Sequence, residues 1–174
     1  MWLLFASAIK LEDRGPIFYT QERMGKNGLV FKALKFRSMI PDAEKKTGAV
    51  WATEHDPRVT KVGRVLRATA MDELPQLWNI FKGDMSFVGP RAERPELVEK
   101  FSQKIKNYHD RFLVRPGLTG IAQVYGRYDT PPQHKLRYDL LYIRNQTFCL
   151  DLKLIFLSFW ITFRGKWESR QKKF

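Results

Sequence analysis

The feature that most constrains the fold is Pro75, which follows two acidic residues and a leucine in the segment TAMDELPQLWN, residues 69–79. Within a helix, proline is tolerated in the first turn, where a backbone N–H has no partner to lose. We therefore expect a helix that begins between Met71 and Leu74 and runs to Lys82.

Apolar residues in this helix recur at the spacing i, i+3, i+4 and i+7, which is one stripe of an α-helix. The stripe consists of Leu74, Leu77, Trp78 and Phe81. We expect it to anchor the helix in a hydrophobic core.

Two adjacent carboxylates, Asp72 and Glu73, stand at the predicted helix start and allow two interpretations. An acidic residue at that place most often caps the helix, where the helix dipole favours an ionised acid. One carboxylate is enough for a cap, however, and here two stand close in sequence to several basic residues. This crowding favours a functional site: Arg64, Arg67, Lys82 and Arg91.

The charge of the chain indicates an anionic partner. Its 174 residues carry a formal net charge of +13, and the sequence pI is about 10.0. Nucleic acid, anionic lipid and phosphorylated substrates are all compatible with this charge. Aromatic residues make up 14% of the chain and include five tryptophans, which is typical of a protein that meets a membrane interface.

The remaining pattern predicts a single α+β domain over residues 1–174. We expect a small sheet with helices packed to one side. The hairpin strands are expected at 16–21 and 29–36, a mobile loop at 40–57 with a short helix at 42–46, a strand-like run at 84–91, and helices at 61–68, 93–107 and 133–145.

Both ends of the chain carry apolar segments. Residues 1–9 are too short to cross a bilayer; they resemble the end of a longer membrane-entering helix, with a short core helix as the alternative. Residues 150–165 form a second apolar segment, whose core at 150–163 would cover roughly 20 Å as a helix. It is either a buried core helix or a helix lying in the membrane interface, and the basic tail at 166–174 favours the interface.

The ordered motifs of the chain resemble those of the bacterial sugar transferase family, the monotopic polyprenyl-phosphate phosphoglycosyl transferases. They cover roughly residues 15–165. The matching segments are GPIF (15–18), QERMG (21–25), KFRSM (35–39), DPRVT (56–60), LR (66–67), DELPQL (72–77), KGDMS (82–86), VGPR (88–91) and RPGLTG (115–120), with Asn79, Gln123, Gly126 and Arg127.

The resemblance implies an enzyme that moves a sugar-1-phosphate from a UDP-sugar to undecaprenyl phosphate and releases UMP. By resemblance, Asp72 is the nucleophile that forms a phosphosugar–aspartyl intermediate. Glu73 holds Mg²⁺, with Asp72 beside it, and Arg67 stabilises the dyad and the phosphate charge. Such chemistry needs cations, because a carboxylate is repelled by a diphosphate.

Further basic and amide residues are candidates for substrate binding. Lys35 and Arg37 alternate along a predicted strand, so both would face one pocket, and Arg91 follows the turn at residues 89–90. Arg115 and Arg127 flank glycine-rich turns, where contact with the nucleotide and simple turn stabilisation fit equally well. Gln123 is a candidate for the sugar or uracil through its motif alone.

The resemblance also predicts the setting of the enzyme. We expect it at an anionic membrane surface on the cytoplasmic face of the bacterial inner membrane, in exopolysaccharide or related glycan assembly, without a nucleic-acid partner. A homodimer stays open, as does the sugar. Two alternatives remain: a catalytically silent membrane-surface fragment of this family, and a basic nucleic-acid-binding module.

Overall fold

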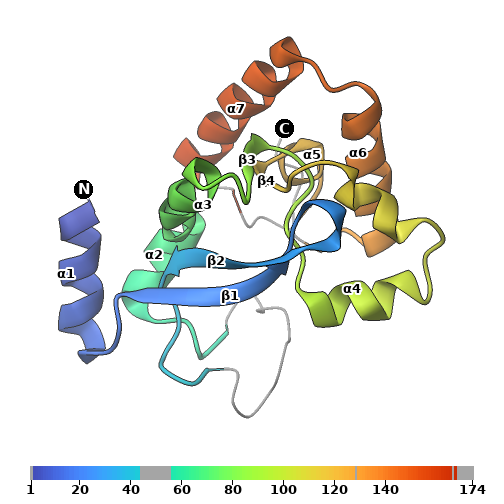
Figure 1. The fold of residues 1–174 in the computed structure, drawn as a ribbon. Coiled ribbons are helices and arrows are strands. Elements are labelled where there is room, and N and C mark those ends of the chain that lie inside the picture. Colours follow the sequence, from blue (N-terminus) through green and yellow to red (C-terminus); the bar gives the residue numbers. More distant parts are fainter. Residues whose placement is uncertain (1, 44–55, 128, 166, 168–174) are drawn as a thin grey trace.

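The computed structural model describes residues 2–43, 56–127, 129–165 and 167. These residues form an α+β fold, as predicted, in which a two-stranded hairpin crosses the molecule between helices (Figure 1). The hairpin has α1 and α2 at one end and α4 at the other, while α7 lies along the top of that view. The helix predicted at 42–46 lies mostly outside the described residues.

The hairpin consists of β1 (Phe18–Met24) and β2 (Val30–Phe36), which pair antiparallel from Phe18↔Phe36 to Met24↔Val30. A short 3₁₀-helix, η1 (Lys26–Gly28), joins the strands. The turn needs a left-handed backbone at Asn27, with φ 56°, a conformation that asparagine adopts more readily than most residues. The predicted hairpin is therefore confirmed.

Two helices pack at one end of the hairpin. They are α1 (Trp2–Asp13) and α2 (Lys61–Ala68). Thr60 caps α2 by accepting a hydrogen bond of 2.9 Å from the backbone N–H of Gly63. A small core forms where Ile9 of α1, Phe36 of β2 and Leu66 of α2 meet.

The helix predicted from residues 71–74 to 82 is split in two. It consists of the 3₁₀-helix η2 (Met71–Gln76), with Pro75 inside it, and the short helix α3 (Leu77–Phe81). Before η2 the backbone of Ala70 is left-handed, with φ 52° and ψ 18°.

The predicted core stripe on this segment is wrong beyond its first member. Leu74 packs against the small core, but Trp78 is 55% exposed and Phe81 is 80% exposed. Leu77, Trp78 and Phe81 all belong to α3, and the rings of Trp78 and Phe81 stack on each other. They therefore share a face as predicted, but that face is exposed rather than packed in a core.

The second half of the chain packs around a short parallel pair, β3 (Ser86–Val88) and β4 (Gly117–Thr119). Its other elements are α4 (Pro95–Ser102), η3 (Tyr108–Leu113), α5 (Ile121–Tyr125), α6 (Pro132–Arg144) and α7 (Phe148–Phe163). The helix predicted at 93–107 is shorter than expected, since α4 covers only Pro95–Ser102, and the left-handed backbone of Asn107 then precedes η3. The helix predicted at 133–145 is confirmed.

In this region the backbone at Gly117 lies so close to the backbone at Gly89 that no side chain fits between them. A Cβ atom on Gly117 would lie 2.1 Å from the backbone nitrogen of Gly89. Only glycine fits at such a contact, which lets the segment after β3 lie directly against β4.

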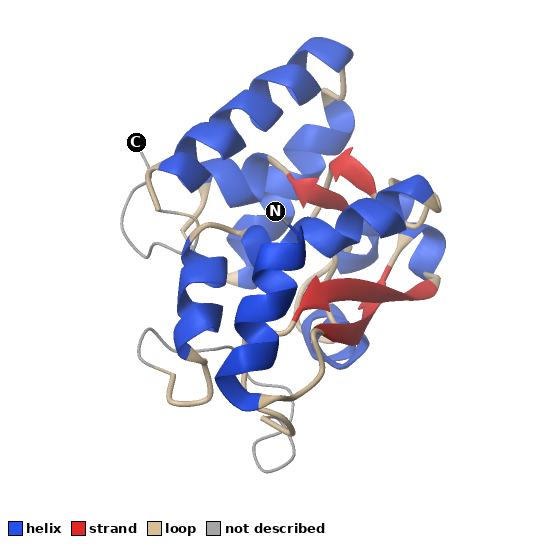
Figure 2. Cartoon of the chain, turned by 90° about the vertical axis from the view of Figure 1, so that its left-hand side faces the viewer, coloured by secondary structure: helices blue, strands red, loops and turns tan. Residues whose placement is uncertain are grey.

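The apolar helix α7 is buried on one side and exposed on the other. Leu154 and Ile161 are buried in the core with Val88, whereas Phe156 and Phe163 are 73% and 88% exposed. Among the described residues, no helix has both the length and the apolar character needed to cross a membrane. Figure 2 views the molecule from the side on which α1 lies.

Candidate active site

A cavity of about 630 Å³ gathers most of the predicted site residues. Its walls come from the hairpin, from the segment 37–43, from η2, from the segment after β3, and from α5 and α6. Asp72 and Glu73 both line it, and they are only 8% and 5% exposed. Both acids of the predicted dyad are therefore buried at one cavity.

Glu73 is held by two cations from different elements. Lys35 of β2 donates through Nζ to Glu73 Oε1 over 2.7 Å, and Arg91 Nη2 donates to the same oxygen over 2.6 Å. Burial alone would raise the pKa of Glu73, but the charges of Arg91 and Lys35 hold that pKa well below its usual value. Glu73 is therefore ionised at neutral pH.

Two opposing effects act on the pKa of Lys35. Burial lowers the pKa of its ammonium group, while the charges of Glu73 and Asp72 raise it. The negative charge of Asp72 thus acts on the cation that holds Glu73. We name the three residues Glu73, Lys35 and Arg91 the clamp.

Arg37 also lines the cavity, but its guanidinium is paired with Asp13 at the end of α1. Its Nη1 donates to Asp13 Oδ2 over 2.6 Å, its Nη2 donates to the other carboxylate oxygen, and its Nε donates to the carbonyl of Pro16 over 2.6 Å. The predicted alternation of Lys35 and Arg37 holds for the cavity, yet the two cations serve different carboxylates.

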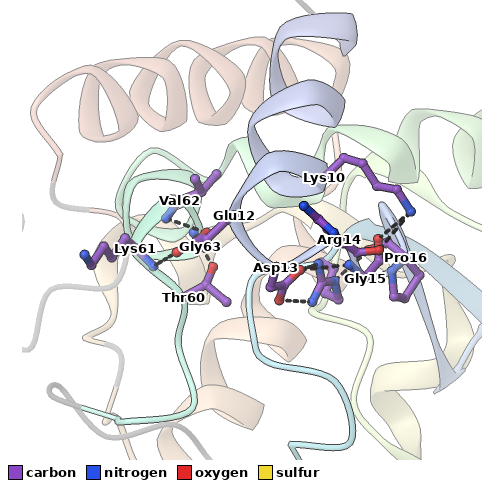
Figure 3. A network of polar contacts seen from close by, with 11 residues as sticks. Lys10, Glu12, Asp13, Arg14, Gly15, Pro16, Thr60, Lys61, Val62 and Gly63 are labelled. Atoms are coloured by element: carbon purple, nitrogen blue, oxygen red, sulfur yellow. Dashed lines mark hydrogen bonds and ion pairs between the residues drawn. The ribbon is translucent and has the colours of Figure 1, made fainter.

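The residue beside Asp13 joins α1 to α2. Glu12 accepts hydrogen bonds from the backbone N–H groups of Lys61 and Val62, at 2.6 and 3.1 Å. Figure 3 shows Glu12 and Thr60 converging on the first turn of α2. These contacts join residues about 50 positions apart, so no local sequence pattern announces them.

The other predicted site residues divide into two groups. Arg67, Gln123 and Arg127 line the cavity, and Arg127 also pairs with Asp129 over 3.0 Å. Arg115 is exposed and is not part of the cavity lining; its guanidinium lies near Gly83 instead. The structure therefore gathers all of the predicted residues except Arg115.

Sequence reasoning missed a second group of charged residues on the same cavity. Arg111 and Asp139 line it together with Glu93 and Lys135, and Arg111 Nη2 lies 2.8 Å from Asp139 Oδ2. One signal was available, because Asp139 stands three residues after the apolar Leu136 in the helix predicted at 133–145 and so lies on the same face. A charged residue on a buried stripe needs a partner.

The carboxylates are suitable donors for Mg²⁺ if the substrate completes the site. The described residues contain no group of three or more His, Cys, Asp or Glu side chains placed to hold a metal. Mg²⁺ is commonly bound by one or two carboxylates together with substrate phosphates and water. Asp72 and Glu73 fit that requirement, although a metal at Glu73 would compete with Lys35 and Arg91.

Comparison with known proteins identifies the group to which these residues belong. The sequence profile of the bacterial sugar transferase family matches residues 1–165. The chain belongs to this family. The predicted resemblance is thus confirmed, and the comparisons do not favour a nucleic-acid-binding module.

Individual relatives point the same way. The chain is 42% identical over 159 residues to a UDP-N-acetylgalactosamine-undecaprenyl-phosphate N-acetylgalactosaminephosphotransferase of Aeromonas hydrophila, covering 90% of this chain and 37% of the relative. It is 43% identical over 169 residues to a UDP-glucose:undecaprenyl-phosphate glucose-1-phosphate transferase of Klebsiella pneumoniae, covering 94% and 36%.

A third relative is a putative undecaprenyl-phosphate N-acetylgalactosaminyl 1-phosphate transferase of Bacillus subtilis. It is 55% identical over 111 residues, which cover 64% of this chain and 62% of the relative. The chain thus spans little more than a third of the length of the first two relatives. The names of these relatives also differ in the sugar.

Proposed function

We propose that the chain transfers a sugar-1-phosphate from a UDP-sugar to undecaprenyl phosphate and releases UMP. The observation that carries the proposal is the buried Asp72–Glu73 pair, which lines a cavity beside three cations, Lys35, Arg67 and Arg91. Family membership and the names of the relatives support the same reaction.

In the proposed first step, a carboxylate oxygen of Asp72 attacks the β-phosphorus of the UDP-sugar. An O–P bond forms to Asp72, and the bond from that phosphorus to the bridging oxygen breaks, so that UMP leaves with the oxygen. In the second step, a phosphate oxygen of the lipid attacks the same phosphorus and releases Asp72. Two displacements let one site serve a soluble and a lipid substrate in turn.

Charge is the main obstacle to the first step, because both Asp72 and the diphosphate are anionic. Within the clamp, Lys35 and Arg91 neutralise the charge of Glu73, so the dyad does not present two uncompensated negative charges to the substrate. Arg67, at the end of α2, lines the cavity and would meet the developing phosphate charge. Bound Mg²⁺ would add positive charge at the diphosphate.

The lipid substrate implies a membrane surface, and exposed apolar side chains support that part of the proposal. These side chains lie on the three helices α1, α3 and α7. On α3 the rings of Trp78 and Phe81 stack, with 5.4 Å between their centroids. Half-buried helices with exposed aromatic residues suit a membrane interface, and the charge of +13 suits anionic lipid on the cytoplasmic face. Strongly exposed members are Leu3, Leu4 and Leu11 of α1, Phe81 of α3, and Phe148, Phe156, Phe159 and Phe163 of α7.

The test is UMP release from UDP-glucose, UDP-galactose and their N-acetylated analogues, with undecaprenyl phosphate and Mg²⁺ in detergent. We expect release by the parent chain, and a loss of roughly 10³-fold or more in Asp72→Asn. Asp110→Asn is the matched control, since it removes the same charge from η3 at a carboxylate outside the cavity lining.

Three other results would each decide the matter differently. Equal release by the parent and Asp72→Asn would contradict the role of Asp72. UDP-sugar binding without release would favour the silent membrane-surface alternative. Absence of both binding and release would overturn the proposed function.

A further inference from the structure

A buried ionic network lies on the cavity next to the clamp, and the transfer proposed above uses none of it. Arg111 and Asp139 each have side chains only 2% exposed, and Arg111 Nη2 lies 2.8 Å from Asp139 Oδ2. Arg111 Nη1 donates to the hydroxyl of Tyr108 over 2.5 Å and lies 4.0 Å from Glu93 Oε1. Burying such charges is costly, so their arrangement needs an account.

The network touches the clamp through the backbone of Arg91. The same Arg111 Nη2 that faces Asp139 donates to the carbonyl oxygen of Arg91 over 3.0 Å. The side chain of Arg91 then donates to Glu73 over 2.6 Å. A continuous series of contacts therefore runs from Asp139 through Arg111 and Arg91 to Glu73, the neighbour of Asp72.

The segment that carries Arg91 is fixed by donors to four successive carbonyls. Arg91 forms an isolated parallel bridge with Gly117 of β4, whose N–H donates to the Pro90 carbonyl over 2.9 Å. The Ala92 carbonyl accepts from Arg23 Nη1 over 2.9 Å, and the Glu93 carbonyl accepts from the backbone N–H of Met24 over 2.8 Å, so both donors belong to β1. Arg111 supplies the donor to the carbonyl of Arg91 itself.

We propose that Asp139 is a positioning residue for the phosphosugar transfer. Its carboxylate orients the Arg111 guanidinium, which holds the Arg91 backbone and so keeps the Glu73 carboxylate in place beside Asp72. This inference rests on the function proposed above. It assigns to α6 a part in the reaction that no motif of the dyad region indicates.

The charged groups around Asp139 give the inference a pH signature. Asp139 faces Arg111 of η3 and Glu93, which precedes α4, and Lys135 lies one turn earlier on α6. Burial raises the pKa of the Asp139 carboxyl to about 6, against the attraction of Arg111. The pKa of Glu73 lies far lower, so protonation of Asp139 is the first acid step in the series.

The experiment measures kcat, KM and their pH dependence in four proteins: the parent, Asp139→Asn, Asp139→Glu and the control Asp110→Asn. We expect Asp139→Asn to lower kcat by about 100-fold with KM for the UDP-sugar changed less than about threefold, because misplacement by an ångström has an effect of that size. Asp139→Glu should recover part of the loss. The fall of kcat on the acid side, near pH 6, should disappear in Asp139→Asn. Titration of the substrate cannot cause this difference, because it is the same in all four proteins.

A second variant separates positioning from folding. Asp139→Asn combined with Arg111→Met removes both buried charges, so its thermal stability should exceed that of the single variant. Under the proposal its kcat stays low, because Arg91 has lost its donor. Recovery of stability and kcat together would overturn the proposal, as would an unchanged kcat in Asp139→Asn.

A readout independent of turnover separates failure of the inference from failure of the proposed function. The Arg91 Nε–H resonance in a ¹⁵N NMR spectrum should be sharp and shifted in the parent and in Asp110→Asn, and averaged toward a free guanidinium in Asp139→Asn. If the Arg91 resonance differs in this way between the parent and Asp139→Asn but the parent releases no UMP, the proposed function alone is refuted. An identical Arg91 resonance in all variants would refute the positioning role whether or not the parent is active.

Discussion

The chain contains two pairs of adjacent acids that face the same strand end, and they are used in opposite ways. Glu12 and Asp13 are exposed at the end of α1, whereas Asp72 and Glu73 are buried in η2. The cations that end the hairpin are divided between them, since Lys35 pairs with Glu73 and Arg37 with Asp13.

The exposed pair caps a helix, which is the structural role that the sequence also allowed for the buried pair. Glu12 caps a helix by accepting from two backbone N–H groups of α2, and Asp13 pairs with Arg37. No backbone cap is formed by Glu73, whose carboxylate is turned to the two clamp cations. Burial beside a cavity, rather than the pairing of acids in sequence, therefore separates the dyad proposed to react from the structural pair.

Among the substitutions that test this contrast between the two acid pairs, the largest effect is expected at Glu73. Glu73→Gln leaves Lys35 and Arg91 without a compensating carboxylate, so we expect the free energy of unfolding to fall by about 2–3 kcal/mol. UMP release should fall by about 100-fold, because the charge balance beside Asp72 is lost. Denaturant unfolding and the UMP assay measure the two effects.

Glu99→Gln is a suitable control for this substitution, since Glu99 is an exposed carboxylate on α4. It should leave both quantities close to those of the parent. Retention of full activity in Glu73→Gln would show that the clamp is structural, and the contrast between the two acid pairs would then be one of stability only.

A smaller effect is expected at Glu12. Glu12→Ala removes the acceptor for the N–H groups of Lys61 and Val62, which should lower the free energy of unfolding by about 1 kcal/mol. UMP release should stay within about twofold, because Glu12 does not line the cavity. Denaturant unfolding of Glu12→Ala and Glu99→Ala, measured side by side, checks this prediction. A large loss of UMP release in Glu12→Ala would contradict it and would mean that α1 contributes to the reaction.

The smallest effect concerns Asp13 and its dependence on pH. The hydrogen bond from Arg37 is the main cause that lowers the pKa of the Asp13 carboxyl from 3.8 to about 2, while burial acts in the opposite direction. Because the folded-state pKa is the lower one, the pair stabilises the fold above pH 4, and this contribution is lost as the pH falls toward 2.

The side chain of Asp13 is 25% exposed, so solvent screening limits this contribution to roughly 0.5 kcal/mol. The difference in unfolding free energy between the parent and Asp13→Asn should shrink between pH 4 and pH 2, and also in high salt at neutral pH. A difference that stays constant across that range would mean that Arg37 has another partner of equal strength.

The sequence predicts those parts of the fold that depend on local patterns. The hairpin and the helices predicted at 61–68 and 133–145 are observed close to their predicted bounds, because the signals that mark them lie within a few residues. The prediction that Trp78 and Phe81 lie in a core was wrong, because periodicity marks one face of a helix and does not show whether that face meets the core. The exposure of those rings also depends on what covers them.

The site was predicted through motifs, and its long-range contacts were not. Asp72, Glu73, Lys35 and Arg91 were named in advance and meet at one cavity. The partner of Arg37 is 24 residues away in sequence, and Arg111 and Asp139 meet only after α6 has packed. Such contacts are set by tertiary packing, which a single sequence does not record.

The left-handed backbone of Ala70 has a consequence for engineering the protein. An alanine in that conformation costs roughly 1 kcal/mol, and it stands two residues before Asp72. Glycine would remove this cost and is the substitution that a stability screen would select first. Glycine is also free to leave the left-handed region, so the gain in stability would come with a wider range of orientations for the dyad. Thermostabilisation and turnover are therefore opposed at this one position.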